Sequence, residues 1–220
     1  MKNKKVSIII PAYNEEKIIG ETLKHLKFNW IKEIIVINDG SSDHTYNIIK
    51  NYPVKIINFE KNRGKGKAVK EGLNQATGNL ISFLDADLGE SVIEVEKLVK
   101  PVIEGKADIT VAVLPIKGGG LGLVRNLARS GLKYLTGATL QAPLSGQRVF
   151  HSKVLKDLLP LADGFGLEVG MDIDLIRNNY KIIEIECQFT HNVTGKDWKG
   201  FVHRANQFRD ILKTFWKKRE

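Results

Sequence analysis

The stretch Gly78-Asn-Leu-Ile-Ser-Phe-Leu-Asp-Ala-Asp-Leu-Gly89 decides how the rest of the chain is interpreted. Residues 80–84 form a short apolar run with β-branched and aromatic members, which predicts a buried strand because a helix needs about ten or more residues. The apolar character ends at Asp85 and Asp87. Strand alternation points these two carboxylates the same way, at the sheet edge where α/β proteins bind ligands.

Two neighbouring carboxylates repel each other unless a cation lies between them, and hard divalent ions accept oxygen ligands of this kind. The pair therefore predicts a metal site on Asp85 and Asp87. The alternative is that both are solvated residues that close a strand, and the three-residue pattern alone leaves the two interpretations open.

Strand and helix patterns alternate on both sides of this stretch. Before it, the apolar run at 6–10 and the patterns at 33–38 and 54–58 predict strands, and helices are expected at about 15–26, from 43 to about 51, and at 68–76. Such β-α units predict an α/β fold with a mostly parallel, doubly wound sheet. After it we expect strands at 107–113 and 181–188, and residues 143–150 are expected to form a loop that leads into a further strand. Helices are expected at 91–103, around 125–129, from 164 to 178 (amphipathic) and at 201–218 (basic).

Length and composition fit one domain of an ordinary globular protein. The chain has 220 residues, 42% hydrophobic and 27% charged, with a single cysteine, Cys187, which excludes an internal disulfide. This composition and the absence of an apolar run near 20 residues predict a cytoplasmic protein. We expect one domain at 1–195, with halves at 1–115 and 116–195, and a helical tail at 196–220. The net charge of +9 suits an anionic ligand, a nucleic acid or an anionic membrane.

Polar residues follow the first two predicted strands. Asn14 and Glu15 could bond the base and ribose of a nucleotide, and Asp39 could accept from an imide N–H or a hydroxyl. The alternative in each case is helix capping, with Asn14 at one helix and Ser41 or Ser42 assisting at the next.

The segment Asn62-Arg-Gly-Lys-Gly-Lys67 precedes a predicted helix. Its glycines permit close approach of a ligand to the backbone, and a helix N-terminus favours anions. A diphosphate is therefore a natural ligand of Gly64, Lys65 and Lys67. Neither of the two best-known glycine-rich phosphate motifs is present. A basic solvated loop is the alternative.

Four features of the second half of the sequence have a possible functional role, each with a structural alternative. The triplet 118–120 is a mobile lid or a linker. Arg148, in Ser145-Gly146-Gln147-Arg148, faces a phosphate or carboxylate, or is a surface arginine. Glu168, flanked by glycines and apolar residues, is an acid/base group or a helix-start carboxylate. His191 follows the last strand. A metal site on Asp85 and Asp87 needs further ligands, and the loop that contains His191 could supply a third one.

Four motifs in order resemble the family 2 glycosyltransferases with a GT-A fold. They are Pro-Ala-Tyr-Asn-Glu-Glu (11–16), Asp-Gly-Ser-Ser-Asp (39–43), Asn-x-Gly-Lys-Gly-Lys-Ala (62–68) and Asp-Ala-Asp (85–87). The resemblance implies that Mg²⁺ or Mn²⁺ is bound by Asp87 with Asp85 and His191. It implies that the nucleotide sugar is held by Pro11, Ala12, Tyr13, Asn14, Glu15, Asp39, Gly64, Lys65, Lys67, Asp85 and Ala86.

Two branches of that family share features with the chain. Asn-x-Gly-Lys-Gly and Ser-Gly-Gln-Arg (145–148) are similar to dolichyl-phosphate mannose synthases. The triplet 118–120, Pro-Leu-Ser-Gly (143–146), Gly-Phe-Gly-Leu-Glu-Val-Gly (164–170) and His191 resemble glucosyl-3-phosphoglycerate synthases, although Leu121 stands where that group has an acceptor-binding arginine. The resemblance implies that Gly119, Gly120, Ser145, Gly146 and Glu168 hold the acceptor, and that Glu168, Asp87 and Arg148 are catalytic. It also implies that 1–195 is a catalytic domain, with a nucleotide-sugar half at 1–115 and an acceptor half at 116–195.

The sequence thus predicts a metal-dependent hexosyltransferase that uses a UDP- or GDP-hexose and an acceptor alcohol or phosphate, either a small phosphorylated molecule or a polyprenyl phosphate. One alternative is a sugar-1-phosphate nucleotidyltransferase, but Pro11-Ala-Tyr-Asn-Glu15 stands where its glycine-rich signature belongs. The other is a non-catalytic basic module for membrane or nucleic acid. The basic tail with interleaved aromatics leaves open a peripheral membrane contact or a homodimer; no nucleic-acid partner is expected.

Overall fold

The computed structural model describes residues 5–115, 122–162, 164–190 and 198–219. Its centre is a seven-stranded sheet with the order β3-β2-β1-β4-β6-β5-β7. The strands are β1 (Val6–Ala12), β2 (Ile31–Asn38), β3 (Lys55–Asn58), β4 (Leu80–Phe83), β5 (Ile109–Val113), β6 (Arg148–His151) and β7 (Ile182–Glu186).

Helices connect most of these strands. The α-helices are α1 (Ile19–His25), α2 (Thr45–Ile49), α3 (Lys65–Gln75), α4 (Val95–Ile103), α5 (Gly122–Thr136), α6 (Leu155–Leu158), α7 (Leu167–Arg177) and α8 (Trp198–Lys217), and the short 3₁₀ helices are η1 (Gly89–Glu94), η2 (Ser152–Val154) and η3 (Gly164–Gly166). The predicted α/β class and mostly parallel sheet are confirmed.

The sheet reverses its winding direction at β1. β1 pairs in parallel with β2 on one side and with β4 on the other. β6 is the antiparallel member, inserted between β4 and β5. Ligands of open α/β sheets bind at the carboxyl ends of the strands where the winding reverses, so the fold directs attention to the ends of β1 and β4.

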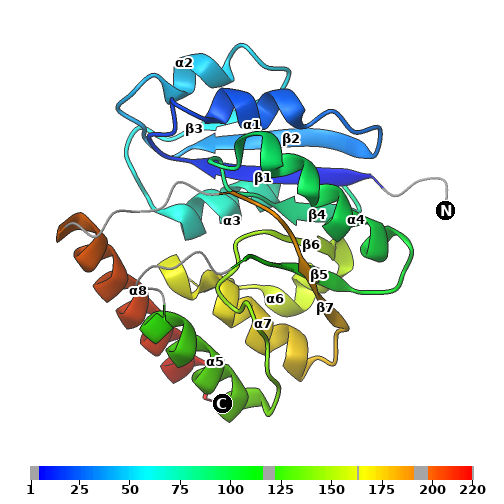
Figure 1. The fold of residues 1–220 in the computed structure, drawn as a ribbon, viewed down its shortest axis with the longest axis vertical. Helices are drawn as coiled ribbons and strands as arrows, with labels where there is room; N and C mark the ends of the chain where they lie inside the picture. Colours follow the sequence, from blue (N-terminus) through cyan, green and yellow to red (C-terminus); the bar gives the residue numbers. More distant parts are fainter. Residues whose placement is uncertain (1–4, 116–121, 163, 191–197, 220) are drawn as a thin grey trace.

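Helices cover both faces of the sheet (Figure 1). Ile8 and Ile10 of β1 enter a core cluster with side chains of α1, α2 and α4. Ile9 points the other way, into a cluster with α3, α6 and α7. This alternation buries both faces of β1 and explains why residues 6–10 are apolar without interruption.

A third cluster lies where α5 and α8 pack beside α7, with Ile182 of β7 at its border. Val124, Ala128 and Leu132 of α5 meet Ile211 of α8 there. α5 and α8 cross closely at Gly131, where an added Cβ would collide with the ring of Phe215. The predicted C-terminal helix is therefore an integral part of the packed structure.

Two predicted helix starts differ from the structure. α1 begins at Ile19 rather than near residue 15, and Asn14 is not its N-cap but lies in a left-handed conformation with φ 55°. α3 begins at Lys65, three residues before the expected start, because Gly64 (φ 89°) allows the chain to turn directly into the helix.

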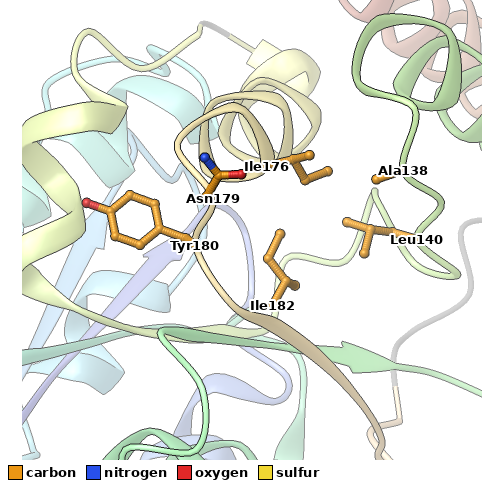
Figure 2. Close-up of a pocket in the computed structure, with 6 residues that line it drawn as sticks. All are labelled: Ala138, Leu140, Ile176, Asn179, Tyr180 and Ile182. Atoms are coloured by element: carbon orange, nitrogen blue, oxygen red, sulfur yellow. The ribbon is translucent and has the colours of Figure 1, made fainter.

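A pocket of about 380 Å³ lies at the amino end of β7, away from the carboxyl ends of β1 and β4. Figure 2 shows Ile176, Ile182 and Leu140 converging on it, whereas Tyr180 points away from it, toward its hydrogen-bond partner Asp157. Among the described residues, no helix combines the length and the apolar character that a membrane crossing requires.

Candidate functional site

The ends of β1 and β2 are joined by side chains of the first two motifs. The backbone N–H of Asn14 donates to Ser41 Oγ at 3.0 Å, and Asn14 Oδ1 accepts from the backbone N–H of Ser42 at 2.9 Å. The N–H of Glu15 donates to Thr45 Oγ1 at 2.8 Å. Asn14 therefore shapes the loop by bonding the neighbouring strand end, which also fixes where Glu15 lies.

Asp39 ties the end of β2 to the basic loop. It is 3% exposed, and its two carboxylate oxygens accept from the backbone N–H groups of Arg63 (2.7 Å) and Gly64 (2.9 Å). Gly40 permits this approach, since it has φ +68° and a Cβ there would collide with the backbone of Lys61. The amides of Arg63 and Gly64 thus bind Asp39, which positions the N-terminus of α3 beside the site.

Lys65 connects the two predicted halves of the enzyme. Its ammonium lies 2.8 Å from Asp85 Oδ1, just beyond β4, and 3.3 Å from Glu168 Oε1, in the first turn of α7. Burial lowers the pKa of Lys65, but Asp85 and Glu168 outweigh that effect and raise it above its ordinary value. Lys65 is therefore a fixed cation between the strand-end carboxylate and Glu168.

The loop before β6 packs against this ion pair. Gln147 Nε2 donates to Asp85 Oδ2 at 2.5 Å. A Cβ on Gly146 would lie 2.5 Å from Lys65 Nζ and 3.1 Å from the Asp85 oxygens, so only glycine fits without a shift of the lysine. Ser145, Gly146 and Gln147 are all buried, and they bring the expected acceptor segment into contact with the strand-end carboxylate.

Arg148 does not lie where a phosphate could reach it. Its side chain and that of Asp172 are both fully buried, and their ion pair measures 2.9 Å. Arg148 also donates to the carbonyl oxygen of Ser145 at 2.8 and 3.2 Å. The expectation of a cation facing the ligand is thus replaced by a buried arginine that holds the loop before β6 against α7.

Negative charge accumulates between the ends of β1 and β4. The pKa of Glu15 is raised to about 7, chiefly by burial and further by the negative charges of Asp87, Asp85 and Asp43. These three carboxylates therefore lie close enough to Glu15 to disfavour its ionised form. Carboxylate oxygens in such a field fit Mg²⁺ or Mn²⁺, so the residues present are suited to the metal that the sequence predicts.

The other predicted residues divide into two groups. Ala12 and Ala86 are buried at the ends of β1 and β4, whereas Tyr13 and Lys67 are exposed near them. Gly119, Gly120 and His191 lie outside the described residues. Among the described residues, the group of three side chains that comes within metal-binding distance is Glu21, His25 and Glu90, distinct from the strand-end carboxylates, and exposed acidic groups commonly approach in this way without an ion.

Sequence reasoning missed three residues that support the site. Gln147 lies inside a motif that was quoted but was given no role, although its amide contacts Asp85. Thr22 and Asp172 lie on helices, in positions that look like ordinary helix residues. No pattern in the sequence distinguishes them, because their roles depend on contacts with distant segments.

The fold and the strand-end site define the chain as a glycosyltransferase of the GT-A class. Residues 7–158 match the model of Glycosyl transferase family 2, and the chain belongs to this family. The predicted enzyme class is therefore confirmed.

Relatives of several kinds share the sequence. The chain is 34% identical over 164 residues to an uncharacterized protein of Methanocaldococcus jannaschii, covering 70% of this chain and 68% of that one. It is 29% identical over 213 residues to a dolichol-phosphate mannosyltransferase of Pyrococcus furiosus, covering 87% of this chain and 58% of the relative. A dolichyl-phosphate β-glucosyltransferase of Trichomonas vaginalis is 38% identical over 113 residues, 44% of this chain and 33% of the relative.

The solved structures that match include glucosyl-3-phosphoglycerate synthase of Mycobacterium tuberculosis in complex with phosphoglyceric acid. It aligns with a TM-score of 0.82 at 26% identity, covering 98% of this chain and 80% of that one. A further structure of that enzyme, at 25% identity and a TM-score of 0.82, contains Mn²⁺, UDP and glucosyl-3-phosphoglycerate.

Proposed function

We propose that this glycosyltransferase moves a hexose from UDP-hexose or GDP-hexose to an acceptor that carries a phosphate, with Mg²⁺ or Mn²⁺ as cofactor. The observation that carries the proposal is the contact of Lys65 with both Asp85 and Glu168. It joins the strand end where a nucleotide sugar is expected to the helix start where an acceptor hydroxyl or phosphate is expected.

On the donor side, the loops after β1 and β2 form the nucleotide subsite. Ala12, Asn14, Glu15 and Asp39 meet at these strand ends, with Pro11 and Tyr13 alongside. Carboxylate and amide side chains at such an edge can accept from a base imide and from ribose hydroxyls. Gly64 and Lys67, at the start of α3, lie on the diphosphate side, where a helix N-terminus favours anions.

Asp87 and Asp85, with His191 as a third ligand, would hold the metal. When bound, such an ion acts as a Lewis acid that stabilises charge on the departing diphosphate. Lys65 and Gln147 each bond one carboxylate oxygen of Asp85. In this proposal Asp87 is the principal ligand, and Asp85 orients the surrounding groups.

On the acceptor side, Glu168 would orient or deprotonate the attacking hydroxyl or phosphate oxygen. It is 7% exposed, in the first turn of α7. The Lys65 ammonium lies 3.3 Å from its carboxylate. Ser145 and Gly146 form the wall of this subsite, with Gly119 and Gly120 expected to complete it.

Arg148 takes a positioning role in the proposal. It bonds the Ser145 carbonyl oxygen and Asp172 from inside the protein. Because Asp172 follows Glu168 by one helical turn, the pair fixes the Ser145 loop relative to the start of α7. A small displacement of such supporting groups lowers catalytic rates strongly.

The proposed acceptor class is based on a chemical group that the acceptors named for the relatives have in common. Both dolichyl phosphates and phosphoglyceric acid carry a phosphate monoester. A phosphate-bearing acceptor therefore covers both groups, and the experiment below separates a polyprenyl phosphate from a small phosphorylated molecule.

The experiment is calorimetric titration with a panel of UDP- and GDP-hexoses, with and without Mn²⁺. We expect one donor to bind in a metal-dependent manner, and the Asp87→Ala variant to lose that binding. Donor turnover is then followed by mass spectrometry with polyprenyl phosphate in detergent and, separately, with 3-phosphoglycerate.

Glu96→Ala is the matched control, because Glu96 is an exposed carboxylate on α4 outside the site. It should bind the donor like the parent protein. Failure of every donor to bind under either condition contradicts the proposal. Binding that survives in Asp87→Ala contradicts the metal assignment alone.

A further inference from the structure

A groove runs between α5 and α8. It has a volume of about 460 Å³ and is lined by Gly131, Tyr134, Leu135, Leu212, Phe215, Trp216 and Arg219. Tyr134 is 87% exposed and Trp216 is 69% exposed. Figure 1 shows the two helices at the periphery, green and orange to red.

Exposed apolar side chains continue from the groove along the same side of each helix. Leu123 and Tyr134 are eleven residues apart on α5, three turns along the same side, and both are exposed. Phe208, Leu212 and Trp216 repeat every four residues on α8 and are exposed as well. Exposed apolar side chains scattered singly are normal, whereas a stripe of this kind on two packed helices marks an interaction surface.

The charge of the protein is concentrated on the same two helices. Residues 122–136 and 198–219 contain ten lysines and arginines and one aspartate, and the remainder of the chain has 24 of each sign. The whole formal charge of +9 therefore belongs to α5, α8 and the two residues after α8. Exposed cations in the described part of this surface are Lys133, Arg209, Lys213, Lys217 and Arg219.

We propose that this α5–α8 face, defined by the exposed apolar stripes and their surrounding cations, docks on the surface of an anionic lipid bilayer. Leu123, Tyr134, Phe208, Leu212 and Trp216 enter the interface, and the cations meet anionic headgroups. Aromatic and aliphatic groups with lysine and arginine on the polar side are the composition of helices that lie in the membrane interface.

The combination of positive charge and exposed apolar side chains favours an anionic bilayer over a second copy of the chain or a nucleic acid. A second copy docked through the same face would bring two surfaces of like charge together, which costs free energy. A nucleic acid would satisfy the cations but would leave the aliphatic Leu123 and Leu212 without a partner. An anionic bilayer satisfies both parts of the surface at once.

The docking face is rigidly joined to the acceptor side of the site. α8 packs on η3, where an added Cβ at Gly164 would collide with Asp210 and one at Gly166 with Thr214. Glu168 follows η3 by two residues, so a bilayer bound by α8 has a fixed relation to Glu168. The inference deepens the proposed function by favouring a lipid-linked phosphate acceptor, while the docking itself does not depend on sugar transfer.

The test is flotation of the full chain with phosphatidylcholine vesicles, prepared with and without phosphatidylserine, at low and high salt. We expect binding only to the vesicles with phosphatidylserine, and weaker binding at high salt because ions screen exposed charges. Each basic residue near such a surface strengthens binding about fivefold, so Lys213→Glu/Lys217→Glu should weaken it by more than about tenfold. Leu212→Ser/Trp216→Ser should weaken it at both salt concentrations.

The matched controls are Lys27→Glu/Lys100→Glu and Ile93→Ser, which change exposed residues outside α5 and α8. Equal weakening by these controls, equal binding to vesicles without phosphatidylserine, or no binding to either vesicle overturns the proposal. A dimer in analytical ultracentrifugation that Trp216→Ser dissociates, without vesicle binding, would assign the face to self-association instead. An oligonucleotide bound in preference to vesicles would assign it to nucleic acid.

Donor titration of the same variants separates this inference from the proposed function. Docking variants should bind the nucleotide sugar like the parent protein, since none of the altered residues lies at the strand ends. Loss of vesicle binding with intact donor binding concerns the α5–α8 face alone. Absence of donor binding with intact vesicle binding contradicts the proposed function and leaves the docking surface standing.

Discussion

The hydroxyl of Thr22 donates to the carbonyl oxygen of Ala86 at 2.8 Å. The same oxygen atom of Thr22 accepts from the backbone N–H of Gly89 at 2.8 Å. Thr22 has no exposed surface, and it belongs to α1 rather than to the strand that it supports. A buried helix residue thus holds both ends of the turn that carries Asp87.

Replacement of Thr22 by valine keeps the shape of the side chain and removes its hydroxyl. The buried carbonyl of Ala86 and the buried N–H of Gly89 would then each lose a hydrogen-bond partner. Each loss lowers the free energy of unfolding by up to about 1–3 kcal/mol. We expect a lower midpoint of urea unfolding and, because the Asp85–Asp87 turn relaxes, Mn²⁺-dependent donor binding that is about tenfold weaker. Calorimetric titration and urea unfolding measure the two effects.

Thr22→Ser is the control, since it keeps the hydroxyl and loses a methyl group. It should be destabilised by about 1 kcal/mol while its affinity for donor and metal stays at the parent value. If Thr22→Val binds donor and Mn²⁺ as well as Thr22→Ser does, Thr22 stabilises the fold without positioning the turn.

Glu168 should affect transfer rather than donor binding. We expect Glu168→Gln to reduce turnover by about 10²–10⁴-fold, the usual contribution of a general base. The donor affinity should remain within a factor of about two, because Glu168 lies on the acceptor side of Lys65. Turnover is measured by nucleoside diphosphate release at saturating donor.

Glu186→Gln, an exposed change on β7, serves as the comparison for Glu168→Gln. It should leave both quantities unchanged. If Glu168→Gln loses donor affinity in proportion to turnover, Glu168 belongs to the donor subsite and the proposed assignment is wrong.

Variants of Arg148 distinguish a buried positioning residue from a residue that contacts the ligand directly. Arg148→Met leaves the buried Asp172 and the carbonyl oxygen of Ser145 without their arginine partner, a loss of up to about 3–5 kcal/mol in stability. Burial already raises the pKa of Asp172 to about 7, although Arg148 acts to lower it. The double variant Arg148→Met/Asp172→Leu removes both charges and should recover part of the stability in urea unfolding.

The partial recovery should be accompanied by weak catalysis, since the carbonyl of Ser145 still lacks its arginine partner. Donor affinity at low temperature, where the variants remain folded, should be close to that of the parent protein. A donor affinity that falls by more than about a hundredfold in folded Arg148→Met would indicate that Arg148 reaches the ligand.

Local sequence was sufficient for most of the fold. The apolar runs at 6–10 and 80–84 became β1 and β4, because buried parallel strands need apolar residues on both faces. The carboxylates that follow β4 could be recognised because the change from apolar to charged residues is abrupt. The family motifs added the order of the elements, which no single pattern contains.

Side-chain partners could not be inferred in the same way. Arg148 was expected to face a ligand because a polar motif surrounds it, yet its partner Asp172 is 24 residues away on α7. Asn14 was a plausible helix cap by its position, but Ser42 captures its side chain. Such choices are made by segments that meet only in the folded protein.

Glu33 gives the last prediction, which concerns stability and pH. This residue of β2 accepts from the hydroxyls of Ser7 and Thr77, each at 2.6 Å, and from the backbone N–H of Thr77 at 2.8 Å. Burial acts to raise the pKa of Glu33, but these hydrogen bonds outweigh it and hold the pKa below its ordinary value of 4.5. The folded protein therefore binds fewer protons at Glu33 than the unfolded chain does, so the stabilisation is complete above pH 4.5 and is lost as the pH falls through the lowered pKa.

Glu33→Gln should accordingly cost about 1–2 kcal/mol in urea unfolding near neutral pH, since hydrogen bonds to a charged acceptor are stronger than those to an amide. The difference between parent and variant should shrink as the pH is lowered below 4.5, because the parent carboxyl then becomes neutral as well. Glu71→Gln, on α3, provides the reference for an acidic residue whose loss should not follow this profile. A parent–variant difference that stays constant from neutral pH to acid would mean that the charge of Glu33 does not contribute to it.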